Sequence, residues 1–152
     1  MKMNKLAALL AASTMVAAST AMADDHASAF TTSASVALST DYMWRGASQT
    51  DSEPAISGSF DLGHASGLYA GVWASNIDYM IGTDQAHIEL NYYAGFANDI
   101  GDTGISYDVG ALRYAFPGTD GADWNEAYIG LSYSMFSLKV SHSGDALATS
   151  ES

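Results

Sequence analysis

The sequence predicts an all-β protein: an antiparallel up-and-down transmembrane β-barrel, partial, with about seven strands visible. Three observations predict it. Short segments of alternating apolar and polar residues follow one another along the chain, long and short connectors alternate between them, and a secretion signal precedes them. Outer-membrane barrels combine such strands with short turns on the periplasmic side and longer loops outside.

The N-terminus has the three parts of a signal peptide. Lys2 and Lys5 form a basic start, an apolar run covers Leu6–Ser19, and Ala21 and Ala23 frame a small-x-small cleavage site. The apolar run is shorter than the roughly 20 residues that a transmembrane helix needs. We therefore expect cleavage after Ala23, with residues 1–23 as the signal peptide and residues 24–152 as the exported barrel domain.

Seven segments beyond residue 30 carry the period-two pattern of strands. They are Ser35–Arg45, Ala55–Gly63, Leu68–Asn76, Ala86–Phe96, Gly104–Phe116, Asn125–Met135 and Leu138–His142. The connectors between them are in turn long, short, long, medium, long and very short. Glycine and aromatic residues at period two do not form the 3.6-residue apolar stripe of a helix, so strands are predicted throughout.

Each predicted strand has one apolar face and one polar face, because successive side chains point to opposite sides. Nearly all charges fall on the polar face, which predicts that they line a lumen. The candidate lumen-facing residues are Asp41, Arg45, Asp61, His87, Glu89, Asp108, Glu126 and Lys139. Arg113 alone falls on an apolar face, near a strand end where a bulge or snorkelling could accommodate it.

Tyr42 and Trp44 close the first predicted strand on the same face as Val36 and Leu38. Aromatic residues at the end of an apolar strand face are typical of the girdle that a barrel places at the membrane interface. The sequence therefore predicts an aromatic girdle that includes Tyr42 and Trp44. A sandwich core could hold aromatic residues in a similar way.

The charge excludes some partners. Without Lys2 and Lys5 the chain keeps three basic residues against 17 acidic ones, a formal charge of −14. Phosphate binding needs clustered Lys and Arg, so no nucleic-acid partner is expected. The chain contains no cysteine, so no disulfide framework is predicted. The acidic excess predicts a preference for cations or neutral solutes.

No enzyme motif is found, and we expect no catalytic residues, no cofactor and no metal site. Phosphate loops and the HExxH and GxSxG patterns are absent from the sequence. Two other readings stay open. One is a soluble periplasmic or secreted β-sandwich binding module. The other is a lipid-modifying barrel enzyme using Glu89, Ser141 and His142, although the spacing of these residues does not favour it.

The segment Ser39–Thr50 (STDYMWRGASQT) resembles the opening signature of the TorF-family porins of Gram-negative bacteria. Further similar segments are GLYAGVWASNID (67–78), LNYYAGF (90–96), YDVGALRYAFPG (107–118) and EAYIGLSYS (126–134). The resemblance implies an outer-membrane barrel that passes small hydrophilic solutes. It implies outer-membrane lipid and the barrel-assembly machinery as partners. Members of that family continue for several more strands, so the chain is interpreted as truncated at its C-terminus.

Overall fold

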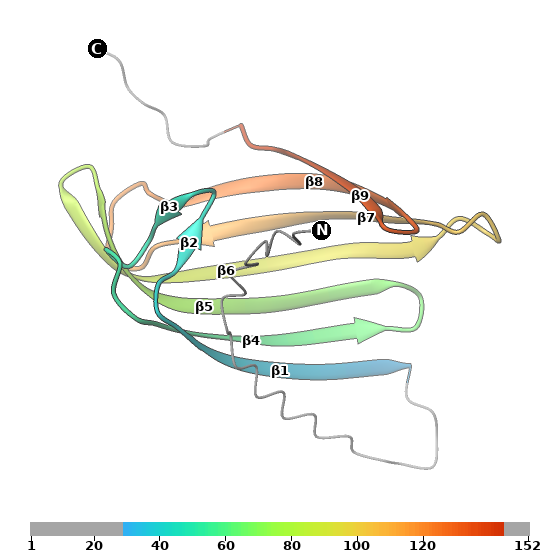
Figure 1. The fold of residues 1–152 in the computed structure, drawn as a ribbon, viewed down its shortest axis with the longest axis horizontal. Helices are drawn as coiled ribbons and strands as arrows, with labels where there is room; N and C mark the ends of the chain where they lie inside the picture. The colour runs from blue at the N-terminus through green and yellow to red at the C-terminus, as the bar shows by residue number, and fades with distance from the viewer. Residues whose placement is uncertain (1–28, 145–152) are drawn as a thin grey trace, which may run out of the picture.

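The computed structural model describes residues 29–144, so the predicted signal peptide and its cleavage after Ala23 lie outside the described residues. Figure 1 shows one large antiparallel sheet and a small hairpin at one of its ends. The seven strands of the sheet follow chain order, β1-β4-β5-β6-β7-β8-β9. The prediction of an all-β antiparallel fold with about seven strands is confirmed. No helix among residues 29–144 is long and apolar enough to cross a membrane.

The strands of the large sheet are β1 (Phe30–Ser39), β4 (Ala55–His64), β5 (Leu68–Ile81), β6 (Asp84–Asp99), β7 (Ile105–Ala115), β8 (Trp124–Tyr133) and β9 (Phe136–His142). The hairpin consists of β2 (Met43–Trp44) and β3 (Ala47–Ser48). β1 and β9 are the two edges of the sheet and do not pair with each other. Closure of the sheet into a barrel therefore stays a prediction.

The two faces of the sheet differ in what covers them. The β2–β3 hairpin packs on one face, which we call the hairpin face, and we call the opposite face the bare face. Large apolar side chains on the bare face are solvent-exposed, with Ile56, Phe60 and Ile129 all more than half exposed. On the hairpin face, Glu89 and Glu126 are only 3% and 6% exposed. This polarity is the reverse of that in a water-soluble domain, where charged side chains are rarely buried.

An aromatic core fills the hairpin face near the hairpin. It consists of the buried residues Ile77, Ala86, Tyr114, Phe116, Ala122 and Trp124, with Tyr42, Trp44 and Leu112 packed against them. Trp44 lies edge-on to both Tyr114 and Trp124, with ring centroids 6.1 Å apart in each pair. The core thus joins the hairpin to the loop that follows β7.

The predicted first strand, Ser35–Arg45, is wrong at both ends. β1 begins at Phe30 and ends at Ser39, and the chain then folds back as a hairpin. Arg45 and Gly46 form the two-residue turn with φ of 46° and 88°, the left-handed values that such a turn requires. Tyr42 and Trp44 consequently pack on the hairpin face and do not share the face of Val36 and Leu38.

Two predicted connectors are also corrected. Most of the expected loop at 77–85 is strand, because β5 and β6 continue to a turn at Gly82 and Thr83. A register shift between Asn76 and Tyr79 hid this continuation, since a bulge breaks the period-two pattern. The last turn is formed by Ser134 and Met135, not by the two residues that follow them.

Candidate functional site

Five of the charged residues expected to face a lumen lie on the hairpin face. They are Asp61, Glu89, Asp108, Glu126 and Lys139, on five different strands. The register places Lys139 opposite Gly130, and its Nζ lies 3.6 Å from the ring centroid of Tyr128. The alternation of side chains along the strands thus brings these residues to one side of the sheet, as expected.

Asp41 and His87 do not join them. Asp41 lies in the loop after β1, where its Oδ1 accepts hydrogen bonds from Ser48 Oγ (2.6 Å) and Thr50 Oγ1 (2.9 Å). It therefore holds the loop together. His87 is solvent-exposed and lies opposite the bulge of β5, where the alternation of faces is interrupted.

Arg45 comes to the sheet on the hairpin and not on a strand. Its Nη2 donates a 2.7 Å hydrogen bond to Oε1 of the buried Glu126, forming an ion pair. Its guanidinium also lies 4.3 Å from the ring centroid of Trp44. The charge of Glu126 is thereby balanced by a residue 81 positions away in the chain.

Three tyrosines lie across three glycines on the middle of the hairpin face. The directly opposite pairs are Tyr69 with Gly95, Tyr93 with Gly71, and Tyr128 with Gly110. A Cβ atom at Gly71 would lie 2.6 Å from the ring of Tyr93. Each ring therefore occupies the space that a side chain on the next strand would need.

The hydroxyl groups of these tyrosines contact the carboxylates of the same face. Tyr69 donates a 2.5 Å hydrogen bond to Asp108 Oδ1 and also bonds to the hydroxyl of Tyr128. Tyr93 donates to Oδ1 of Asp61. Sequence reasoning missed this network, although the alternation of Tyr and Gly at the same parity was the signal that could have revealed it.

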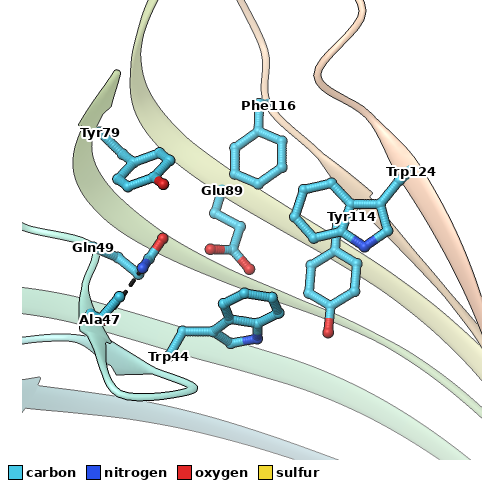
Figure 2. A pocket seen from close by; sticks show the side chains of 8 residues that line it. All are labelled: Trp44, Ala47, Gln49, Tyr79, Glu89, Tyr114, Phe116 and Trp124. Carbon is cyan, nitrogen blue, oxygen red and sulfur yellow. Dashed lines mark hydrogen bonds between the residues drawn. The ribbon is translucent and has the colours of Figure 1, made fainter. Parts of the chain in front are cut away.

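A small cavity opens where the hairpin meets the sheet, and Figure 2 shows the side chains around it. Its volume is about 70 Å³. It is lined by Trp44, Ala47, Gln49, Tyr79, Glu89, Tyr114, Phe116 and Trp124. The lining is aromatic apart from one amide, one methyl group and one carboxylate.

Glu89 is the charged group of this cavity. Its Oε1 accepts hydrogen bonds from Asn91 Nδ2 (2.6 Å) and from the hydroxyl of Tyr42 (3.3 Å). Partial burial, together with the nearby Glu89 carboxylate, raises the pKa of Tyr42. Tyr42 therefore stays protonated near neutral pH and remains a donor to Glu89.

Among residues 29–144, no three His, Asp or Glu side chains come together in a group that could hold a metal ion. His64 and His142 lie near opposite edges of the sheet, on β4 and β9. The carboxylates of the hairpin face bond instead to tyrosines, an asparagine and an arginine. The chemistry that this face offers is binding and electrostatic attraction.

The fold is therefore a single antiparallel meander. One face of the sheet is acidic and lined by tyrosines, and the other face is apolar and exposed. The chain is a member of the Gcw_chp family, bacterial proteins of unknown function, whose family model matches residues 23–150. No significant match is found among curated proteins or among solved structures. The resemblance to the TorF-family porins stays a prediction.

Proposed function

We propose that this chain forms the wall of an outer-membrane β-barrel in a Gram-negative bacterium, through which small hydrophilic solutes diffuse. The observation that carries the proposal is the reversed polarity of the sheet. Its large aliphatic side chains lie exposed on the bare face, whereas its buried carboxylates lie on the hairpin face beside the aromatic core. A barrel wall needs this arrangement, because lipid contacts one face and water the other.

The bare face supplies an apolar surface that continues from strand to strand. One register row across five strands reads Leu68, Phe96, Val109, Ile129 and Val140. Burying such a row in hydrocarbon stabilises the sheet by about 25 cal/mol for each Å² of apolar surface removed from water. The exposed Arg113 lies on this face near the end of β7, where Asp123 Oδ2 accepts a 2.8 Å hydrogen bond from it. A charge near the membrane interface costs little.

The hairpin face supplies a polar lining with negative charge. Asp61, Glu89 and Asp108 lie on it without a Lys or Arg partner among the described residues, whereas Glu126 is paired with Arg45. A lumen lined by such residues favours cations and neutral solutes over anions. The hairpin itself lies over this face and narrows the path along it.

A soluble β-sandwich binding module is the alternative. It would require a second layer to cover the bare face, because contiguous apolar patches much larger than a few hundred Å² are rare on soluble monomers. Among residues 29–144, the only other sheet is the β2–β3 hairpin, and it packs on the opposite face. No observation of the structure favours the sandwich.

The membrane part of the proposal is tested by fractionating cells that express the protein and running samples on a gel with and without boiling. We expect the protein to require detergent for extraction and to migrate as a compact band that boiling converts to a slower one. Osmotic-shock release of a fully soluble protein would overturn the proposal. A C-terminally extended version run beside it shows whether added strands improve barrel closure.

The channel part is tested by reversal potentials in planar bilayers under a salt gradient. We expect a cation preference that falls in the double variant Asp61→Asn and Asp108→Asn, because amides keep the hydrogen bonds of Tyr93 and Tyr69 but remove two negative charges. The control is Asp102→Asn, which removes a charge in the exposed turn after β6. Equal selectivity in the double variant and the parent would overturn the assignment of these residues to a lumen.

A further inference from the structure

The cavity between the hairpin and the sheet contains a carboxylate that no Lys or Arg among residues 29–144 neutralises. Glu89 is 3% exposed. The two ion pairs among the described residues join Arg45 to Glu126 and Arg113 to Asp123, which leaves Glu89 without a basic partner. An uncompensated buried charge is costly, so such a group usually meets a counter-charge.

One oxygen of this carboxylate is open to a ligand. Both hydrogen bonds that Glu89 accepts, from Tyr42 and Asn91, reach Oε1, and no described residue donates a hydrogen bond to Oε2. Figure 2 shows the carboxylate between the rings of Tyr79, Trp44 and Tyr114. A donor that enters the cavity would therefore meet this oxygen.

A second acceptor lines the same cavity. Gln49 is 8% exposed, and its Nε2 donates a 3.2 Å hydrogen bond to the carbonyl oxygen of Ala47. This bond fixes the orientation of the amide, and Figure 2 shows its oxygen turned away from Ala47. The cavity thus offers a carboxylate oxygen and an amide oxygen to one donor group.

The remaining lining attracts positive charge. Trp44, Tyr114, Phe116 and Trp124 line the same cavity, and the faces of aromatic rings carry negative potential. A cation held over such a ring is attracted to it, and the attraction grows as the cation is desolvated. An anion would be repelled by Glu89, and a neutral apolar molecule would leave the carboxylate unpaired.

We propose that this cavity binds a primary alkylammonium ion, whose –NH3⁺ group donates to Glu89 Oε2 and Gln49 Oε1 while its alkyl group contacts the aromatic rings. The volume of about 70 Å³ suits a group of a few heavy atoms. The proposal deepens the proposed channel function, because it names a solute class that would be held where the hairpin narrows the path. Only the role of the cavity in solute passage rests on the proposed channel function, since binding itself requires no conduction.

The test is a titration of the detergent-solubilised full chain with methylammonium chloride, with sodium chloride replaced at constant ionic strength. Two of the three tryptophans of the chain line the cavity, so intrinsic fluorescence reports on it. We expect a saturable change in the millimolar range, the affinity of a small ligand held by a few contacts. Methanol, a neutral molecule of similar size, should give no saturable change.

Three variants locate the binding. Glu89→Gln should weaken it by about tenfold or more, the effect of losing one charge-assisted contact. Ala47→Leu should also weaken it, because a larger side chain fills the cavity while all charges stay. Asp102→Asn should leave it unchanged, since Asp102 lies in the exposed turn after β6 and does not line the cavity.

Several outcomes would overturn the proposal: no saturable change, an equal response to methanol, or Asp102→Asn weakening binding as much as Glu89→Gln. If Glu89→Gln does not fold, as judged by the absence of the compact gel band, the test relies on Ala47→Leu. Unweakened binding in Ala47→Leu then overturns the proposal. Because the titration is made in detergent solution, absence of binding leaves the conductance result standing. Absence of conductance likewise leaves the binding result standing.

Discussion

At the scale of single residues, the hairpin face is built from tyrosine rings that lie over glycines. Gly71 leaves room for the ring of Tyr93, whose hydroxyl then reaches Asp61 two strands away from the tyrosine's own strand. Glycine normally weakens a strand because it contributes no side chain to packing. Here the opposing aromatic ring covers the exposed backbone and replaces the missing contacts.

Gly71→Ala should destabilise the folded protein by about 1–3 kcal/mol, the usual cost of overpacking. The added Cβ would lie 2.6 Å from Tyr93 Cε2, so the ring must move and release Asp61. The matched control is Gly130→Ala, also on the hairpin face, whose Cβ would have its nearest neighbour at 3.7 Å. Urea denaturation followed by tryptophan fluorescence measures both, and equal midpoints for the two variants would contradict this account.

The sequence predicts the face of a residue well wherever a strand is regular. Period-two alternation put Asp61, Asp108 and Lys139 on the same side, and the register places all three on the hairpin face. It failed for Tyr42 and Trp44, because alternation says nothing once the strand has ended. Their positions depend on contacts with Trp73 and Tyr114, which lie far away in the chain.

At the scale of secondary structure elements, the loop between β1 and β4 is an ordered unit. The Gln49 N–H donates to the Tyr42 carbonyl oxygen (2.7 Å), and the Asp78 N–H donates to the Gln49 carbonyl oxygen (2.7 Å), which ties the loop to β5. Thr50 lies at the centre of this loop and is 1% exposed. Its Oγ1 accepts from the Tyr42 N–H and lies within hydrogen-bond distance of Asp41 Oδ1 and the Glu53 carbonyl oxygen.

Thr50→Val should loosen this loop while keeping its shape. Removing the hydroxyl leaves the Tyr42 N–H without its partner, and a buried unsatisfied group costs about 1–3 kcal/mol. We expect amide hydrogen exchange across residues 40–50 to become roughly tenfold faster, since 1.4 kcal/mol corresponds to a factor of ten. Thr50→Ser keeps the hydroxyl and should exchange at nearly the parent rate. Unchanged exchange in Thr50→Val would show that the backbone contacts alone hold the loop.

Sequence patterns located the strands of the sheet but not the fold of this loop. Long and short connectors alternate as predicted between β1 and β5, because glycine at position 67, with φ of 99°, marks a tight turn. The Arg45–Gly46 turn is a weaker signal, since hairpin turns favour Asn or Asp before Gly. Arg45 tolerates its left-handed φ of 46° here while its guanidinium bonds Glu126.

At the scale of the whole molecule, the sheet has an apolar bare face and two edges that no strand among residues 29–144 pairs with. β1 and β9 present backbone donors and acceptors that hydrocarbon cannot satisfy. A barrel wall made from this sheet therefore requires further strands or a second copy at these edges. The same edges in water would be open to aggregation.

Placing a lysine at either of two positions along β8 distinguishes a bare face in lipid from a bare face in water. Ile129 is 52% exposed at the middle of the strand, and Tyr133 is 58% exposed beside the turn to β9. In a membrane, Ile129→Lys should cost about 2–4 kcal/mol and Tyr133→Lys about 0–1 kcal/mol, because a lysine near the interface reaches water. If the bare face lay in water instead, both changes should stay within about 0.5 kcal/mol. Urea midpoints of protein folded into phospholipid vesicles measure the difference. A large loss at Ile129 alone supports the barrel wall, whereas equal small effects would place the bare face in water and overturn it.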